Sequence, residues 1–154
     1  MNMSTQLLYN DFPTFLRKYF PYKVQKISLN AGFTCPNRDG TKGWGGCTYC
    51  NNQTFNPDYC RTEKSIAIQL EEGKCFFAHK YPEMKYLAYF QAYTNTYAEL
   101  EGLKRKYEEA LAVDGVVGLD WYASRLYAGK FVALSGRFEQ TYVSHGRIWD
   151  RKHL

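Results

Sequence analysis

The chain has 154 residues, 45% of them hydrophobic and 23% charged, which excludes a disordered chain and falls short of the about 200 residues that a complete eight-stranded β/α barrel needs. The net charge is +5, but residues 120–154 hold six of the Lys and Arg residues and three of the acids, so residues 1–119 carry only +2 and a basic nucleic-acid-binding face is not supported. No apolar run approaches the about 20 residues of a membrane span and no signal peptide is evident, so we expect a cytoplasmic protein.

The first part of the chain predicts a short helix, a strand and a long loop. Asn10 and Asp11 can cap a helix that has Pro13 in its first turn, and apolar residues then recur at helical spacing. Residues 22–30 alternate with a period of two, which is typical of a strand. Residues 31–61 are rich in Gly and Pro, and so long a loop in a compact domain is typical of a functional or a disordered segment.

Two further helix–strand pairs follow. Helical spacing runs through residues 62–80 and 98–112, and apolar runs at 85–91 and 115–119 predict strands. Strands that alternate with helices predict parallel βαβ units, so the expected fold class is α/β with about three parallel strands. Periodicity is then lost, which predicts a boundary between residues 1–119 and an atypical tail.

Three thiols lie in the Gly-rich loop that follows the first strand: Cys35, Cys47 and Cys50. In the cytoplasm, cysteines are interpreted as metal or redox groups before disulfides. Thiolates are soft ligands that select zinc, copper(I) and iron–sulfur clusters. Glycines allow the backbone to fold close around such a group, where a Cβ would collide.

Three kinds of site are compatible with these thiols. A structural zinc site wants four ligands, so Cys60 or His79 would have to be the fourth. A redox pair of Cys47 and Cys50 would gain from a helix N-terminus, but no helical pattern starts at Cys47. A [4Fe–4S] cluster held by three thiolates would leave one iron open, where four cysteines are the usual set. The cysteines alone leave zinc and the open cluster level.

The residues around the cysteines resemble those of a known family. The runs KISLNAGFTCPNRDGT (26–41), GGCTYCN (45–51) and YFQAYTNTY (89–97) are similar to those of a bacterial family of radical S-adenosylmethionine (SAM) proteins of unassigned substrate, related to the radical domain of the Elongator catalytic subunit. The resemblance covers roughly residues 8–119, and its blocks fall in the expected order on the expected elements. It implies the N-terminal portion of a partial β/α barrel of the radical SAM type.

The resemblance implies a [4Fe–4S] cluster ligated by Cys35, Cys47 and Cys50, with the fourth iron open to the amino and carboxylate groups of SAM. An electron from an external donor would then cleave SAM to methionine and a 5′-deoxyadenosyl radical, which abstracts a substrate hydrogen. Tyr49 would pack near the adenine, and Gln91 and Asn95 stand in the turn that binds the SAM amino group. The substrate and further catalytic residues are not identified.

Residues other than the three cysteines also have structural interpretations. Tyr49 is one of 14 tyrosines and can be a core aromatic, while Gln91 and Asn95 can cap the helix that begins near residue 98. Lys26 on the first strand can reach a carboxylate, but an exposed lysine at a sheet edge is the more common explanation. Cys60, outside the zinc alternative, is an ordinary thiol.

The chain departs from the family after the third strand, where the family continues with a Ser-x-Gly-Thr-Arg-Pro-Asp block and further βα units. Suitable codons for residues 120–128, read one nucleotide later, encode Thr-Gly-Thr-Arg-Pro-Asp-Cys-Met. Our hypothesis is that a frameshift precedes Asp120, so that the chain is truncated, its third strand has an exposed edge, and it is not expected to turn over a substrate. The coding DNA tests this hypothesis; the alternative is a divergent tail that adds one more helix and strand.

Overall fold

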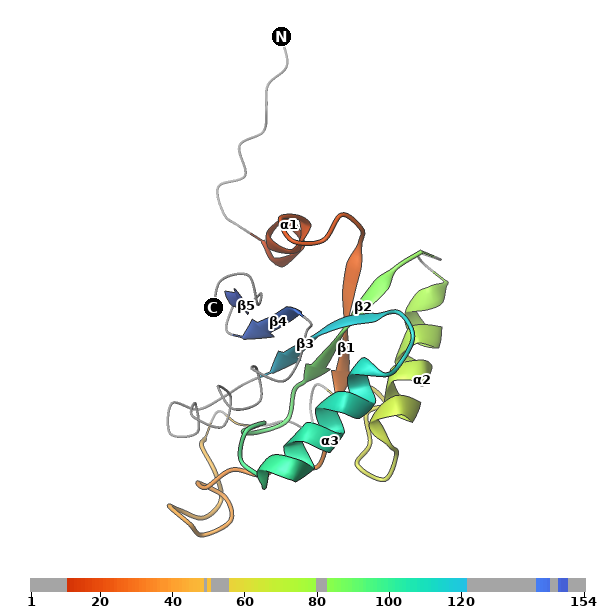
Figure 1. Ribbon diagram of the computed structural model, residues 1–154. Helices are drawn as coiled ribbons and strands as arrows, with labels where there is room; N and C mark the ends of the chain where they lie inside the picture. The colour runs from red at the N-terminus through yellow and green to blue at the C-terminus, as the bar shows by residue number, and fades with distance from the viewer. Residues whose placement is uncertain are drawn as a thin grey trace.

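The computed structural model describes residues 11–48, 50, 56–79 and 83–121, together with the backbone of residues 141–144 and 147–149 (Figure 1). Helices and strands alternate through most of this length. In chain order the elements are α1 (Phe12–Arg17), β1 (Val24–Leu29), α2 (Ile66–Ala78), β2 (Lys85–Phe90), α3 (Leu100–Leu111), β3 (Val116–Trp121), β4 (Thr141–Ser144) and β5 (Arg147–Trp149).

The strands form one sheet in the order β1-β2-β3-β4-β5. The first four strands are parallel and β5 is antiparallel to β4. Lys26 lies opposite Leu87 in this register, and Tyr89 lies opposite Asp120. Because parallel strands end at the same edge, the segments that follow β1, β2 and β3 meet at one side of the sheet.

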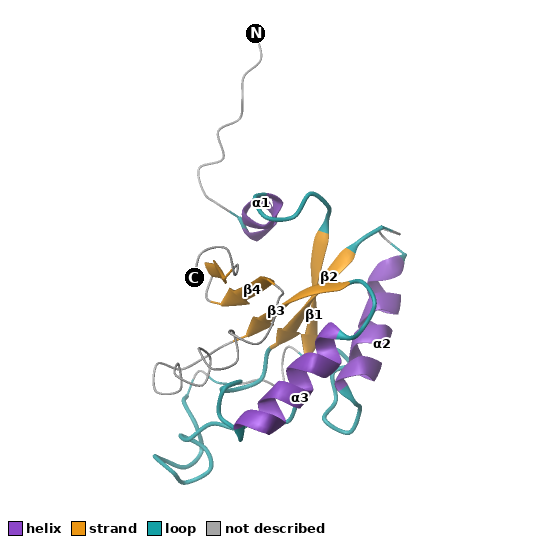
Figure 2. Ribbon diagram, viewed as in Figure 1, coloured by secondary structure: helices purple, strands orange, loops and turns teal. Residues whose placement is uncertain are grey.

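The two faces of the sheet are covered by different helices. Helices α2 and α3 lie side by side on one face (Figures 1 and 2), where Ile27, Leu70 and Leu103 belong to the main hydrophobic core. Side chains alternate along a strand, so Leu87 points to the opposite face from Ala88 and packs with Leu16 of α1. Lys26, Tyr89 and Asp120 share that second face.

The structure confirms the α/β class and the three predicted parallel strands. Asp11 caps α1, as predicted, by accepting a hydrogen bond of 2.7 Å from the backbone N–H of Thr14. Strand β3 continues two residues beyond Leu119, across the predicted boundary, and Trp121 is buried. None of the helices in the described ranges is both long and apolar enough to cross a membrane.

The expectation of an exposed edge at the third strand is wrong. Strand β4, which lies within residues 120–154, pairs with β3 in parallel through Gly118, Leu119 and Asp120. The loss of periodicity after residue 119 concealed this strand because it is only four residues long. Within the described residues, a fourth parallel strand thus follows the three that were predicted.

Gly73 offers a test of how closely α2 packs on β1. A Cβ added at Gly73 would lie 2.4 Å from Cγ2 of the fully buried Ile27 and 3.3 Å from the Tyr59 ring. Overpacking costs about 1–3 kcal/mol and alanine recovers about 1 kcal/mol of helix propensity, so we expect Gly73→Ala to lower the free energy of unfolding by about 1–2 kcal/mol. Urea unfolding monitored by circular dichroism measures this change.

Gly102 is the matched control, because it also lies within a helix but has no atom within 4 Å of an added Cβ. Gly102→Ala is expected to raise the free energy of unfolding by about 0.5–1 kcal/mol through helix propensity alone. Equal effects of the two substitutions would contradict the close approach of α2 to β1.

Candidate functional site: the cysteine loop

The three predicted ligand residues lie in the segment that follows the carboxyl end of β1, here called the cysteine loop (residues 31–48 and 50) (Figure 1). Cys35, Cys47 and Cys50 are half-buried, and the structure places none of the three in a disulfide. The backbone N–H of Cys50 donates to the carbonyl of Cys47 over 3.0 Å. The last two cysteines therefore belong to one tight turn.

Asn37 links the first cysteine to this turn. Its backbone N–H lies 3.4 Å from the Cys35 sulfur, and its side-chain amide nitrogen lies 3.5 Å from the Cys47 sulfur. Its carbonyl also accepts a bond of 2.9 Å from the backbone N–H of Gly46. Two thiols that are twelve positions apart in the sequence are thereby held on either side of one asparagine.

Backbone hydrogen bonds shape the loop between the two linked thiols. The carbonyl of Cys35 accepts a bond of 2.9 Å from the N–H of Arg38, and the carbonyl of Pro36 accepts one of 2.8 Å from Lys42. Gly46 has a φ of +81°, and a Cβ there would lie 2.9 Å from the Arg38 guanidinium, so glycine is required at this position for both conformation and space.

The segment after β2, here called the post-β2 turn (residues 91–97), packs against the cysteine loop. The N–H of Thr94 donates to the carbonyl of Thr34 over 3.3 Å, directly before Cys35. The Arg38 guanidinium lies 4.8 Å from the centre of the Tyr93 ring. Loop and turn thus meet at the carboxyl edge of the sheet, where α/β proteins bind their ligands.

A side-chain hydrogen bond joins the tip of the cysteine loop to the same turn. The hydroxyl groups of Thr41 and Tyr97 are 2.8 Å apart. The backbone N–H of Thr41 donates to the carboxylate of Asp39 over 3.0 Å. Hydrogen bonds from Thr41 to this carboxylate hold the pKa of Asp39 below its usual value. The tip of the loop therefore carries a negative charge that is fixed in place at neutral pH.

Gln91 and Asn95, the predicted residues of the post-β2 turn, make different hydrogen bonds. The backbone N–H of Gln91 donates to the carbonyl of Leu29 over 3.2 Å, which ties the turn to the end of β1. Asn95 is fully buried, and its amide donates to the carbonyl of Ala92 over 2.9 Å. The alternative that these residues cap α3 is wrong, because the N-cap of α3 is Glu99. Tyr49 lies outside the described residues.

Two residues of this turn have features that were not predicted from the sequence. Tyr93 has a positive φ of 60°, a conformation that costs energy for a bulky residue. The Thr96 hydroxyl oxygen is buried without a hydrogen-bond partner among the described residues, which is unusual for a buried polar atom. The residue types alone predict neither the positive φ of Tyr93 nor the buried hydroxyl of Thr96.

Lys26 corrects another expectation. It forms an ion pair with Asp120, whose side chain is 8% exposed. The Lys26 ammonium also lies 4.1 Å from the centre of the Phe12 ring and 4.5 Å from that of Tyr89. Burial, and then the nearby Asp120 carboxylate, raise the pKa of Tyr89. Lys26 lies on β1, the first strand in the sheet order, and it reaches a carboxylate, so that interpretation is confirmed and that of a merely exposed lysine is wrong. The pair belongs to a charged cluster on the face opposite α2 and α3.

Cys60 and His79 are poor partners for the cysteine loop. Cys60 is buried in the main core, its thiol donates to the side-chain carbonyl of Asn56 over 3.9 Å, and burial raises its pKa to about 11. A zinc ligand must lose this proton. His79 is the C-cap of α2. Within the described ranges, no three His, Cys, Asp or Glu side chains gather closely enough to hold a single metal ion.

A hollow lies at the other end of the sheet. It has a volume of about 690 Å³ and is lined by Lys74, Cys75, Lys85 and Asp114, among others. These residues lie at the end of α2 and at the amino ends of β2 and β3. The hollow is therefore separate from the cysteine loop.

The fold and the site thus define a class: an α/β protein with three cysteines, which are candidate thiolate ligands, in a loop at the carboxyl edge of its sheet. The chain is 40% identical over 116 residues to the uncharacterized protein YtqA of Bacillus subtilis and 44% identical over 117 residues to the protein YhcC of Escherichia coli K12. It is 30% identical over 118 residues to the uncharacterized protein MJ0486 of Methanocaldococcus jannaschii.

These matches cover 75%, 76% and 73% of this chain but only 36%, 37% and 34% of the respective relatives. The chain therefore spans little more than a third of the length of the curated relatives it matches. No family model matches the chain, and no solved structure does.

Proposed function

We propose that this chain binds a [4Fe–4S] cluster and SAM, as the radical SAM proteins that it resembles do. The observation that carries the proposal is the arrangement around Asn37, which holds the sulfurs of Cys35 and Cys47 within hydrogen-bond reach of one residue. Outer groups that donate to metal-bound thiolates are a regular part of such sites.

The donor set fits the cluster better than it fits one zinc ion. In a four-iron cluster each thiolate binds a different iron. The ligand sulfurs of such a cluster therefore stand farther apart than the four donors around a single zinc ion. Cys35, Cys47 and Cys50 are half-buried in the loop, whereas the fourth thiol of the zinc alternative, Cys60, lies in the core. When bound, the cluster would supply the electron for reductive cleavage of SAM.

The post-β2 turn is the proposed SAM-binding segment. It packs on the cysteine loop through Thr94 and Tyr97, so a ligand held by the cluster would have this turn beside it. Gln91 and Asn95 belong to the turn and Tyr49 precedes the last cysteine, which supports them as candidates for contacts with SAM. The buried side chain of Asn95 favours a role in shaping the turn.

The proposal is limited to binding, because the matched segment is little more than a third of each relative. The substrate stays unassigned, and an external one-electron donor is the implied partner. We further propose a cytoplasmic location, because a site built from thiolate ligands suits a reducing compartment.

Anaerobic reconstitution with iron and sulfide tests the proposal. We expect the wild-type chain to bind about four irons and to gain a brown colour that dithionite bleaches, because three thiolates hold the cluster. Cys35→Ser, Cys47→Ser and Cys50→Ser are each expected to lose most of the iron. Iron analysis and visible absorbance measure the outcome.

Cys75→Ser and Cys60→Ala are the matched controls, one at an exposed thiol and one at a buried thiol outside the loop. Both should bind iron like the wild type. Binding of one equivalent of zinc without colour, lost in Cys60→Ala, would instead support a zinc-stabilised module. Iron uptake that is indifferent to all three loop substitutions would refute the proposed site.

A further inference from the structure

Asn37 makes contacts that the fold of the loop alone does not require. Its backbone N–H and its side-chain amide face two different cysteine sulfurs, at 3.4 Å and 3.5 Å. The course of the backbone around it is already fixed by bonds from Arg38 to Cys35 and from Lys42 to Pro36. The side chain of this exposed asparagine could bond to water, yet it is directed at Cys47.

Both contacts favour negative charge on the sulfurs. An N–H group beside a thiolate stabilises negative charge on the sulfur, and adding an electron to an iron–sulfur cluster increases that charge. Hydrogen bonds to the sulfurs are among the groups that set the reduction potential of a cluster. A donor that reaches two of three ligand sulfurs is well placed to affect reduction.

We propose that Asn37 is a positioning residue that makes the cluster easier to reduce, through its hydrogen bonds to the sulfurs of Cys35 and Cys47. This inference rests on the proposed function. In the reduction, one electron passes from an external reductant to the cluster, and no covalent bond forms or breaks at Asn37. Its backbone N–H survives any substitution, so the side-chain amide is the part that mutation can remove.

Two substitutions separate the amide from the backbone. Asn37→Ala removes the donor to Cys47, and Asn37→Asp replaces it with a carboxylate of nearly the same shape. We expect the reduction potential to fall in the order wild type, Ala, Asp, because the second change adds a negative charge beside the sulfur. The expected shift for Asn37→Ala is about tenfold in the reduction equilibrium, which is about 59 mV for one electron.

The measurement is an anaerobic redox titration of each reconstituted protein, followed by electron paramagnetic resonance, with iron content determined on the same samples. Asn56→Ala is the control, since Asn56 contacts the thiol of Cys60 rather than a loop cysteine. It is expected to leave the potential unchanged.

The outcomes distinguish this inference from the proposed function. Wild-type protein that binds no cluster refutes the proposed function and the role of Asn37 with it. A cluster in the wild type and in both Asn37 variants at the same potential refutes the role of Asn37 alone. If the Asn37 variants bind no more iron than Cys35→Ser does, Asn37 is a structural clasp of the loop and the inference is likewise refuted.

Discussion

Replacing Gln69 with leucine is expected to lower the free energy of unfolding by about 4 kcal/mol, although the two side chains have similar volumes. Gln69 lies in the first turn of α2 and is fully buried. A buried polar group that loses its partner costs about 1–3 kcal/mol, and Gln69 serves several such groups at once. Urea denaturation followed by circular dichroism measures the loss.

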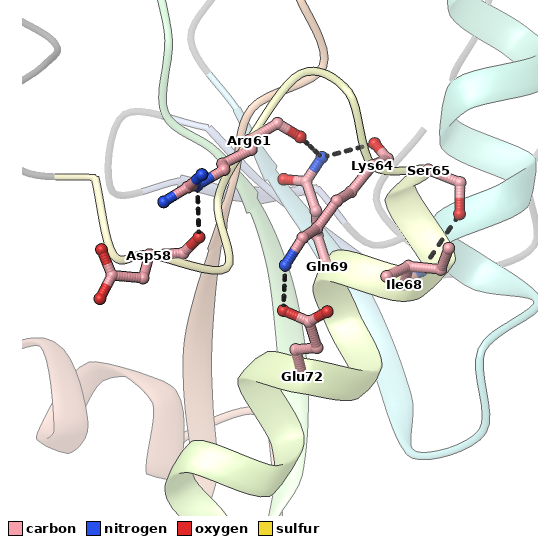
Figure 3. Close-up of polar contacts among 7 residues, drawn as sticks. All are labelled: Asp58, Arg61, Lys64, Ser65, Ile68, Gln69 and Glu72. Atoms are coloured by element: carbon pink, nitrogen blue, oxygen red, sulfur yellow. Dashed lines mark hydrogen bonds and ion pairs between the residues drawn. The ribbon is translucent and has the colours of Figure 1, made fainter.

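The side chain of Gln69 ties two separate stretches of backbone to α2: the end of β1 and the turn that precedes the helix. Its carbonyl oxygen accepts from the N–H of Asn30 over 2.9 Å. Its amide nitrogen lies 3.0 Å from the carbonyl of Asn30, 2.9 Å from that of Arg61 and 3.0 Å from that of Lys64. Figure 3 shows the contacts with Arg61 and Lys64. Asn30 is the residue that follows β1, so this glutamine also fixes where the cysteine loop begins.

Gln25→Leu is the matched control. Gln25 lies half-buried on β1, and its amide donates to one acceptor among the described residues, the carbonyl of Lys26, over 3.0 Å. We expect a change within about 1 kcal/mol, because water can replace this single bond. A comparable small effect of Gln69→Leu would show that the four buried contacts contribute little to stability.

Sequence periodicity was enough to predict the elements that carry the site. The alternation of β1 and the helical spacing of α2 and α3 arise from burial of one face, and burial leaves its record in consecutive residues. The boundaries moved by at most four residues: α2 begins at Ile66 rather than at residue 62, and β3 continues two residues to Trp121. The cysteine loop was also predictable, because glycines and closely spaced thiols are local features.

Contacts between distant parts of the chain could not be predicted. Gln69 meets Asn30 across 39 positions, and Thr41 meets Tyr97 across 56. A glutamine in a helix is ordinarily a surface residue, so its type gives no sign of such partners. Asn37 stood in a motif that the sequence analysis noted, but its direction toward the two sulfurs is a property of the folded loop.

The pair of Lys26 and Asp120 is the clearest case of this limit. Alternation along β1 places Lys26 on the face opposite Ile27, but its partner is 94 positions away and beyond the predicted boundary of the domain. The register explains the pair, since Asp120 lies opposite Tyr89 on the strand next to it and Tyr89 lies opposite Ser28. The fold therefore uses Asp120, whatever the origin of residues 120–154.

Lys26→Met is expected to lower the free energy of unfolding by about 3 kcal/mol. Methionine retains much of the apolar stem, but the nearly buried carboxylate of Asp120 loses its lysine partner, and removing one member of a buried ion pair is strongly destabilising. The contacts of the ammonium with the Phe12 and Tyr89 rings are lost as well, at about 0.5–1 kcal/mol each. Equilibrium unfolding in urea at neutral pH measures the change.

The reverse substitution is expected to cost less. Asp120→Asn leaves Lys26, whose side chain is 30% exposed, and a lysine can extend its ammonium toward water where a short carboxylate cannot. We expect a loss of about 1–2 kcal/mol, and we expect the double variant to be more stable than Lys26→Met alone, because the nearly buried carboxylate that has lost its lysine is then gone as well. Strictly additive losses in this cycle would mean that Lys26 and Asp120 do not interact.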